Sequence, residues 1–252
     1  MSQITNLAYF YERSRKVRGG RAVWVKDSNG ENRKNVLLGG TILNPNKGFG
    51  HLWAAQLVQY TPAEGCLIFR SFEVSDAALA SATTIKIKGD GFSDAPEVGQ
   101  YIMIAPESLV VETLAADTTT GEVTKTVADY TGAYAKITAV EYDAENAKFN
   151  VTLASALGTA LTGGEILVEA DAAADSALAE PTGKATVLVP NPNTFIEADA
   201  DLMPTEGYGL DGTANYSIST VHDKEAWIVK MQPLPKYVLA KNRSYIKGIF
   251  WI

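Results

Sequence analysis

The stretch Thr84-Ile85-Lys86-Ile87-Lys88 decides the fold class, because its apolar and polar side chains alternate with a period of two. This period places the two isoleucines on one face and the lysines on the other, which is typical of a half-buried β-strand. The same alternation recurs in Lys148–Leu153, where three apolar side chains share one face: Phe149, Val151 and Leu153. Both stretches therefore predict strands that lie with one face on a core.

Further strand-like segments with turn residues between them lie on both sides of these two stretches. Gln100–Ala105 is an apolar run that ends at Pro106, and Lys136–Tyr142 precedes a turn at Asp143-Ala144-Glu145-Asn146. Spacings of roughly 8–12 residues between such segments are typical of small sandwiches and barrels. We expect a mainly β protein with few short helices. The stretch Thr113–Asp129, rich in Thr and Asp, predicts an exposed loop or hairpin.

A change in composition over residues 169–184 suggests how the chain is divided. Small and acidic residues dominate there, and Pro181-Thr182-Gly183 closes the stretch, so we interpret it as a linker or a solvated short helix. We expect a small acidic β-barrel or sandwich with its linker over residues 73–182. This domain is inserted between residues 1–72 and 183–252, which together form a second β-rich domain.

Charge is distributed unevenly along the 252 residues. Residues 1–70 carry ten basic and four acidic side chains (+6), residues 71–200 carry six and twenty (−14), and residues 201–252 carry six and five (+1), which sum to −7. This balance excludes a uniformly basic nucleic-acid binder. It suggests that the ends face a partner or a neighbouring copy while the acidic barrel faces water, through contacts that weaken as ionic strength rises.

The basic end has two possible conformations, which the sequence leaves open. One is a helix with an apolar stripe at i, i+3, i+4 and i+7, capped by Ser2 and ended by Gly19-Gly20, and the other is an extended arm. The chain ends on large apolar residues, which are expected to form a final core strand or part of an interface. The candidate partner-binding residues are Arg13, Arg15, Lys16, Arg18, Arg21, Phe250, Trp251 and Ile252.

Local turn signals predict two strand pairs. Asn29-Gly30 lies between Arg21–Val25 and Val36–Leu38 and predicts a hairpin, because both turn residues tolerate positive φ. Tyr216–Val221 and Ala226–Met231 are expected to pair around the intervening polar turn. Lys236–Lys241 is expected to form a helical turn.

Three short motifs contain residue types that are found in enzymes, and each is better explained as a turn or loop. His222-Asp223 with Ser217 or Ser219 lacks the spacing by which an acid orients a catalytic histidine. Gly91–Ala95 lacks the second glycine of a nucleophile elbow, and Gly48–Trp53 has a tryptophan in place of the third glycine of a dinucleotide fingerprint. We expect no catalytic activity.

The composition also limits metal and cofactor sites. Cys66 is the only cysteine, so an intrachain disulfide and a thiolate-rich metal site are excluded, and His51 and His222 are too few for a histidine cluster. Asp199 and Asp201 could bind calcium or magnesium, although a solvated acidic loop explains them more simply. We expect no cofactor, no resident metal, no signal peptide and no membrane-spanning segment.

Several segments resemble virion proteins of tailed bacteriophages. The runs that recur in this order in small β-barrels of such proteins are Glu97–Ile104, Ala135–Val140, Phe149–Leu157 and Gly163–Val168. Leu38–Leu43, with Val58-Gln59-Tyr60 after it, resembles the opening of head decoration proteins. Met231–Pro235 through Trp251–Ile252 is similar to capsid-associated proteins of gut-type phages and prophages, including crAss-like phages. The resemblance extends loosely over residues 36–252.

This resemblance implies a non-enzymatic structural protein, either an auxiliary decoration protein of the head shell or a base for head fibres. The implied partners are the major capsid protein, further copies of the chain and a head-fibre protein, and the implied location is the virion. No membrane, nucleic acid or small-molecule substrate is implied. One alternative is a carbohydrate- or receptor-binding module of a tail or fibre, in which exposed aromatic rings stack on sugars. Another is a hydrolase on a β scaffold, for which His222 and Asp201 would be the residues to substitute.

Overall fold

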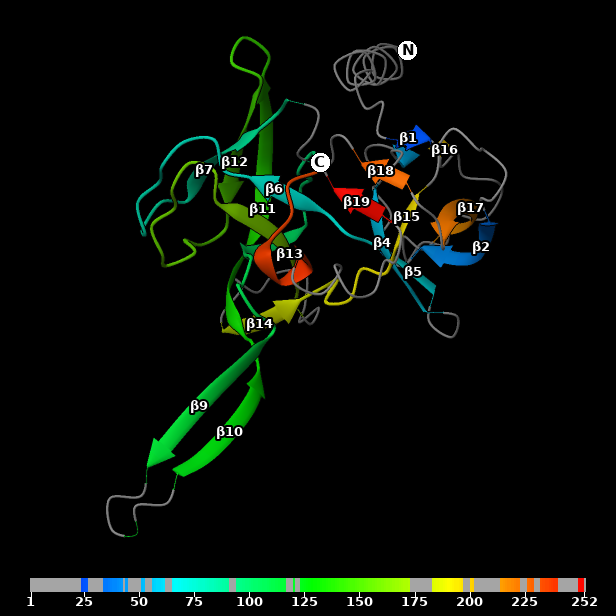
Figure 1. Ribbon diagram of the computed structural model, residues 1–252. Helices are drawn as coiled ribbons and strands as arrows, with labels where there is room; N and C mark the ends of the chain where they lie inside the picture. Colours follow the sequence, from blue (N-terminus) through cyan, green and yellow to red (C-terminus); the bar gives the residue numbers. More distant parts are fainter. Residues whose placement is uncertain are drawn as a thin grey trace.

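The computed structural model describes residues 24–26, 34–42, 44, 51–52, 56–61, 65–90, 94–116, 120, 123–172, 183–196, 200–201, 214–222, 226–228, 232–239 and 249–251 (Figure 1). The protein is mainly β, with 52% of it in strands, which confirms the predicted fold class. One helix is described, a single turn at residues 236–239, where a helical turn was predicted.

The described part of the middle of the chain contributes nine strands: β6 (Ser71–Glu73), β7 (Thr84–Lys88), β8 (Tyr101–Ile104), β9 (Val110–Ala116), β10 (Val123–Asp129), β11 (Gly132–Asp143), β12 (Lys148–Leu153), β13 (Ile166–Asp171) and β14 (Lys184–Val187). Seven of them form one antiparallel sheet in the order β14-β13-β8-β11-β12-β7, with β6 also paired to β13. A bridge between Val74 and Ile87 joins the continuation of β6 to β7.

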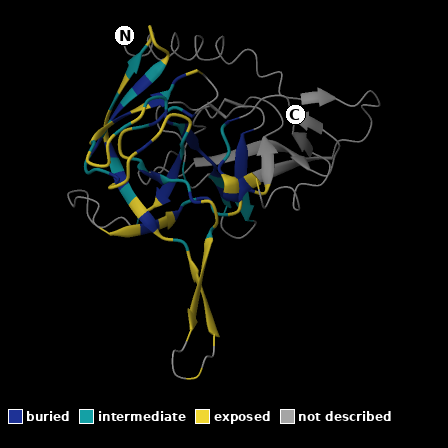
Figure 2. Cartoon of the chain, turned by 60° about the vertical axis from the view of Figure 1, so that its left-hand side comes forward, coloured by how far each residue is buried: buried dark blue, intermediate teal, exposed yellow. Residues whose placement is uncertain are grey.

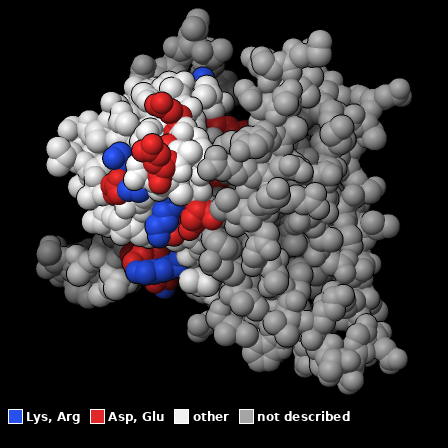
Figure 3. Space-filling model, turned by 90° about the horizontal axis from the view of Figure 1, so that it is seen from above, with Lys and Arg blue, Asp and Glu red and all other residues white. Residues whose placement is uncertain are grey.

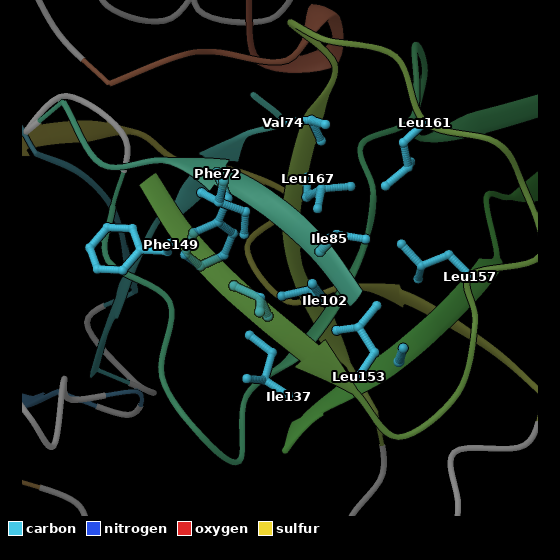
Figure 4. Close-up of a cluster of buried hydrophobic side chains, with 13 residues drawn as sticks. Phe72, Val74, Ile85, Ile102, Ile137, Phe149, Leu153, Leu157, Leu161 and Leu167 are labelled. Carbon is cyan, nitrogen blue, oxygen red and sulfur yellow. The ribbon is translucent and has the colours of Figure 1, made fainter. Parts of the chain in front are cut away.

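One face of this sheet packs on a core made of large aliphatic and aromatic side chains (Figure 4). Ile85 and Ile87 point into it from β7 while Lys86 is exposed, so the alternation that predicted this strand is confirmed. The three alternating residues of β12 also lie in this core, as predicted. Its buried members are Phe72, Val74, Ile85, Ile87, Ile102, Ala135, Ile137, Phe149, Val151, Leu153, Leu157, Leu161 and Leu167.

Strands β8 and β13 are covered on both faces, because a second core lies on the other side of them. Ile102 and Leu167 point into the first core, while their neighbours Met103 and Val168 point into the second. Strands buried on both faces read as nearly continuous apolar runs rather than alternating ones. The second core is completed by residues from the terminal segments, among them Leu57, Phe69, Tyr237 and Val238.

The terminal segments contribute the remaining described strands: β1 (Trp24–Lys26), β2 (Lys34–Ile42), β3 (His51–Leu52), β4 (Leu57–Thr61), β5 (Gly65–Ile68), β15 (Thr194–Ile196), β16 (Ala200–Asp201), β17 (Ala214–His222), β18 (Ala226–Ile228) and β19 (Ile249–Trp251). Strands β15-β17-β2-β5-β4 form a closed barrel, β1-β18-β19 form a three-stranded sheet, and β16 pairs with β3. Strands from before and after the middle sheet are thus paired with one another.

Both local strand pairs predicted in these segments are wrong. Strand β1 pairs with β18 and not with β2, so the turn signal at Asn29-Gly30 does not produce the expected hairpin. Strand β17 pairs with β2 and β15 rather than with β18. The physical reason is the nine-residue ladder between β2 and β17, which offers more cross-strand pairs than either short hairpin would.

A strained turn in the β11–β12 connection gives a first testable prediction. Ala147 has a φ of 51°, in the left-handed region that Asn tolerates better than Ala. We expect Ala147→Asn to raise the free energy of unfolding by up to about 1 kcal/mol. Thermal unfolding of the two proteins measures this, and a lower midpoint for the variant would contradict it. Ala144→Asn, in the same exposed turn but without the positive φ, serves as the control.

Candidate functional site

Strands β9 and β10 form a two-stranded ribbon that projects away from the rest of the chain (Figures 1 and 2). Seven consecutive antiparallel pairs join them, from Val123 opposite Ala116 to Asp129 opposite Val110, with no bulge. Every residue of both strands is exposed. Valine and threonine favour this extended conformation, because their branched side chains fit a pleated surface.

The pairing places four large apolar side chains on the same face of the ribbon. Residues directly opposite each other in an antiparallel pair share a face, and so do alternate residues along each strand. The apolar face is therefore defined by Val110 (41% exposed), Leu114 (68%), Val123 (60%) and Val127 (57%). The three charged side chains of the ribbon, those of Glu112, Lys125 and Asp129, lie on the same face, with Lys125 Nζ 2.8 Å from Glu112 Oε1.

The ribbon is unusual because it leaves large apolar side chains exposed, although the chain has two cores that bury such residues. An isolated pair of strands is marginally stable in water, and its two outer edges leave backbone donors and acceptors without strand partners. Within the described residues, β9 and β10 pair only with each other. Exposed apolar side chains gathered on one element mark interaction sites more often than scattered ones do. We therefore take the ribbon as the candidate functional site.

The residues that flank the ribbon are fixed to the second core. The backbone N–H of Tyr130 donates to the carbonyl of Leu109 at 2.8 Å, and both side chains pack on the second core. Gly132 allows this close packing, because a Cβ at that position would lie 2.7 Å from Tyr130 Oη and 2.8 Å from Met103 Cε. Lys236, in the helical turn, also forms an exposed ion pair with Glu107 just before β9, which adds little to this attachment. The ribbon therefore has a fixed point of departure.

A buried network of polar side chains, called the polar junction below, ties the terminal segments to the middle sheet. Its centre is the ion pair of Arg70 and Glu169, whose side chains are only 4% and 7% exposed, with Arg70 Nη1 donating to both carboxylate oxygens at 3.0 and 3.1 Å. Asn44 Nδ2 and Gln100 Nε2 also donate to Glu169, at 3.0 and 2.9 Å. Burial raises the pKa of the Glu169 carboxyl above its usual range, and the Arg70 guanidinium opposes this shift.

The junction extends along residues 69–71 to three more polar side chains. Asp94 Oδ2 accepts from the Ser71 N–H at 3.0 Å, and Gln56 and Gln232 both donate to the carbonyl of Phe69, at 2.6 and 3.0 Å. Segments that are far apart in the sequence are thereby tied to one short connection. Burying a polar group costs free energy unless the group is hydrogen-bonded. This network therefore holds the middle sheet and the strands of the terminal segments in one arrangement.

Charged side chains on the middle sheet are largely paired within the chain. Lys86 and Lys148 both contact Asp76, at 3.3 and 2.7 Å, and Lys88 contacts Glu73. Acidic and basic atoms accordingly lie side by side on the surface in Figure 3. The hydrogen bond from Lys148 lowers the pKa of Asp76 below its usual range. The net charge of the middle region therefore does not form one uniform acidic surface on this face.

The partner-binding residues suggested by the sequence are described only in part. Arg13, Arg15, Lys16, Arg18, Arg21 and Ile252 lie outside the described residues. Phe250 and Trp251 lie in β19, which runs parallel to β18 and opposite its residues 227 and 228.

The residues of the motifs considered above are also described only in part. Ser217, Ser219 and His222 lie on β17, opposite residues of β2, while Asp223 lies outside the described residues. Asp201 pairs with His51 across β16 and β3, and Asp199 is not described. Among the described residues no three His, Cys, Asp or Glu side chains gather to hold a metal ion. In the same part of the chain no helix has the length and apolar character to cross a membrane.

The ribbon was anticipated only as an exposed loop or hairpin over Thr113–Asp129. The signal that could have located its strands is the pair of segments Val110–Leu114 and Val123–Val127, which flank a polar stretch of sequence rich in Thr. The polar junction was missed, because nothing local marks Arg70 or Glu169 as buried.

Comparison with known proteins gave no match to a family model, to a curated protein or to a solved structure.

The single cysteine supplies a second prediction. Cys66 lies in β5 and is 4% exposed, and burial raises the pKa of its thiol to about 11. We expect a thiol reagent at neutral pH to label the native protein at least roughly a hundredfold more slowly than the unfolded protein, because the thiolate is the reactive form. Labelling kinetics with and without denaturant measure this ratio. Equal rates in the two states would contradict the burial of Cys66.

Proposed function

We propose that this chain is a non-enzymatic structural protein of a phage particle, an auxiliary protein that attaches to the head shell. The observation that carries the proposal is the projecting ribbon, whose apolar face of Val110, Leu114, Val123 and Val127 would be covered by the major capsid protein. This part of the middle region would then face the shell, in contrast to the orientation toward water that the charge distribution alone suggests. The resemblance of the strand-and-turn runs to phage virion proteins supports the choice of partner. The virion is the corresponding location.

The size of the ribbon argues that its apolar face does not act alone. Seven residues per strand span about 24 Å, and one face of two strands offers roughly 250 Å², against about 800 Å² per partner in a stable interface. Further contacts are needed for durable attachment. The basic residues of positions 13–21 and the aromatic end at Phe250, Trp251 and Ile252 are proposed as this second set, with the basic side chains meeting acidic groups of the shell.

Attachment can be measured by mixing the purified protein with head shells that lack it and sedimenting the shells. We expect the protein to sediment with the shells and to be released progressively as salt is raised, because exposed charge contacts are screened. Removal of residues 1–20, or of Phe250–Ile252, is expected to reduce attachment while the middle sheet stays folded. Protein that remains entirely in the supernatant would contradict the proposed function.

The sugar-binding alternative receives no specific support from the aromatic residues of the middle region. Its four tyrosines are half-buried and pack against one of the two cores: Tyr101, Tyr130, Tyr134 and Tyr142. Tyr101 and Tyr134 meet edge to face at 5.8 Å, and Lys136 lies over the ring of Tyr101. A glycan screen in which affinity localises to residues 73–182 would favour that alternative over attachment to a shell.

A further inference from the structure

We propose that the outer edge of β10 pairs with the same edge of a second copy of this chain, antiparallel about a two-fold axis at Val127. This contact uses the edge of the ribbon rather than its apolar face. It is independent of the proposed attachment to a shell, because two purified copies suffice to form it.

The edge of β10 lacks the features by which proteins usually prevent strand pairing. Strand β10 is seven residues long, contains neither proline nor glycine and pairs with β9 without a bulge. Short strands, prolines, bulges and clustered lysines are the common protections of an exposed edge. Lys125 is the only basic residue of β10, and it is already directed to Glu112. The edge is therefore available to another strand.

The charges on β10 select one register with an identical strand. Lys125, Val127 and Asp129 share a face, since they alternate along the strand. When Val127 lies opposite Val127 of the second copy, Lys125 lies opposite Asp129 of that copy, and Asp129 lies opposite its Lys125. Opposite charges in directly opposed positions stabilise a strand pair. On the other face this register sets Thr126 opposite Ala128, so no like charges oppose each other.

Asp129 supports this reading because it has no ion pair within the described residues, whereas Lys125 has Glu112. In the paired arrangement each lysine lies between Glu112 of its own ribbon and Asp129 of the other. Strand β9 offers no equivalent register, because Glu112 is its only charged residue. The second copy is therefore the occupant that charge complementarity favours, and β10 is the edge it uses.

Covalent trapping of the full-length chain tests the geometry directly. Val127→Cys places two thiols opposite each other across the axis, with Cβ atoms about 4.5–5.5 Å apart in such pairs. Leu114→Cys is the matched control, since Leu114 is at least as exposed as Val127 and lies on the same face, but on β9, away from the axis. Native Cys66 is buried and does not compete. Under mild oxidation we expect the first variant to form at least roughly tenfold more disulfide dimer than the second.

Charge reversal then tests the register and separates it from misfolding. In the Val127→Cys background, Lys125→Glu or Asp129→Lys is expected to reduce trapping roughly tenfold, because attractive pairs become repulsive. A mixture of these two variants restores both opposite-charge pairs, so it is expected to regain trapping as mixed dimers. Equal trapping of Val127→Cys and Leu114→Cys, absence of trapping of Val127→Cys, or a mixture that traps no better than its components would overturn the proposal.

Discussion

Replacement of Arg70 by methionine is expected to lower the free energy of unfolding by about 3–5 kcal/mol near neutral pH, because it leaves a buried carboxylate without its charged partner. Arg70 and Glu169 are among the few charged residues that the described chain buries, and Asn44 and Gln100 complete the shell of donors around Glu169. Denaturant unfolding of the two proteins measures the difference.

The size of this loss depends on pH in a direction that the structure fixes. Burial already raises the pKa of Glu169 above its unfolded value of 4.5, and removal of Arg70 takes away a charge that lowers it. A carboxyl with a raised pKa contributes most to stability below its unfolded pKa, and that contribution is lost as the pH rises through the folded pKa. The cost of Arg70→Met is therefore expected to be smaller at about pH 5 than at about pH 8.

Two controls separate this effect from a general loss of packing. The double variant Arg70→Met with Glu169→Gln removes the unpaired charge, so it is expected to be more stable than Arg70→Met alone near neutral pH. Lys236→Met breaks an ion pair whose side chains are 73% and 78% exposed, and it is expected to change stability by less than about 0.5 kcal/mol. A cost of Arg70→Met that equals that of Lys236→Met at every pH would show that the junction is not buried.

Substitution of the apolar face of the ribbon is expected to have the largest effect on attachment to shells. In Leu114→Asp with Val123→Asp, two carboxylates replace exposed apolar side chains, and their burial against a partner would weaken attachment by roughly a hundredfold or more. Both new carboxylates lie close to Lys125, so the ribbon itself is not expected to be destabilised. Co-sedimentation with shells measures the loss.

The matched control for this variant is Leu79→Asp. Leu79 is 77% exposed but lies outside the ribbon, so its replacement is expected to leave attachment unchanged. Both proteins are expected to unfold within about 0.5 kcal/mol of the original, because the substituted side chains are exposed. Normal attachment of the ribbon variant would show that another surface contacts the shell.

The alternation of apolar and polar residues predicted those strands that pack on a core with one face only. The alternation in β7 and β12 located both strands and identified the face that packs on the first core. The partner choices of β1, β2, β17 and β18 could not be obtained in this way. These strands pair with partners 172–204 positions away, and such a choice depends on the total number of cross-strand pairs that each alternative forms. A turn signal such as Asn29-Gly30 reports only the local backbone.

The polar junction shows a second limit of the sequence. Arg70 was counted with the basic end of the chain, and Glu169 with the acidic linker, because composition gives no information on burial. Their roles depend on Asn44 and Gln100, which approach Glu169 from other segments. The ribbon was easier to anticipate as an exposed element. Its apolar face emerged only from the pairing register of β9 and β10.

Electron microscopy of the native particle, with the subunits traced, tests the central claim most directly. The account predicts that the β9–β10 ribbon lies against the head shell, with Val110, Leu114, Val123 and Val127 covered by the shell protein. A particle in which the protein is present but its ribbon points freely into solvent would contradict the account.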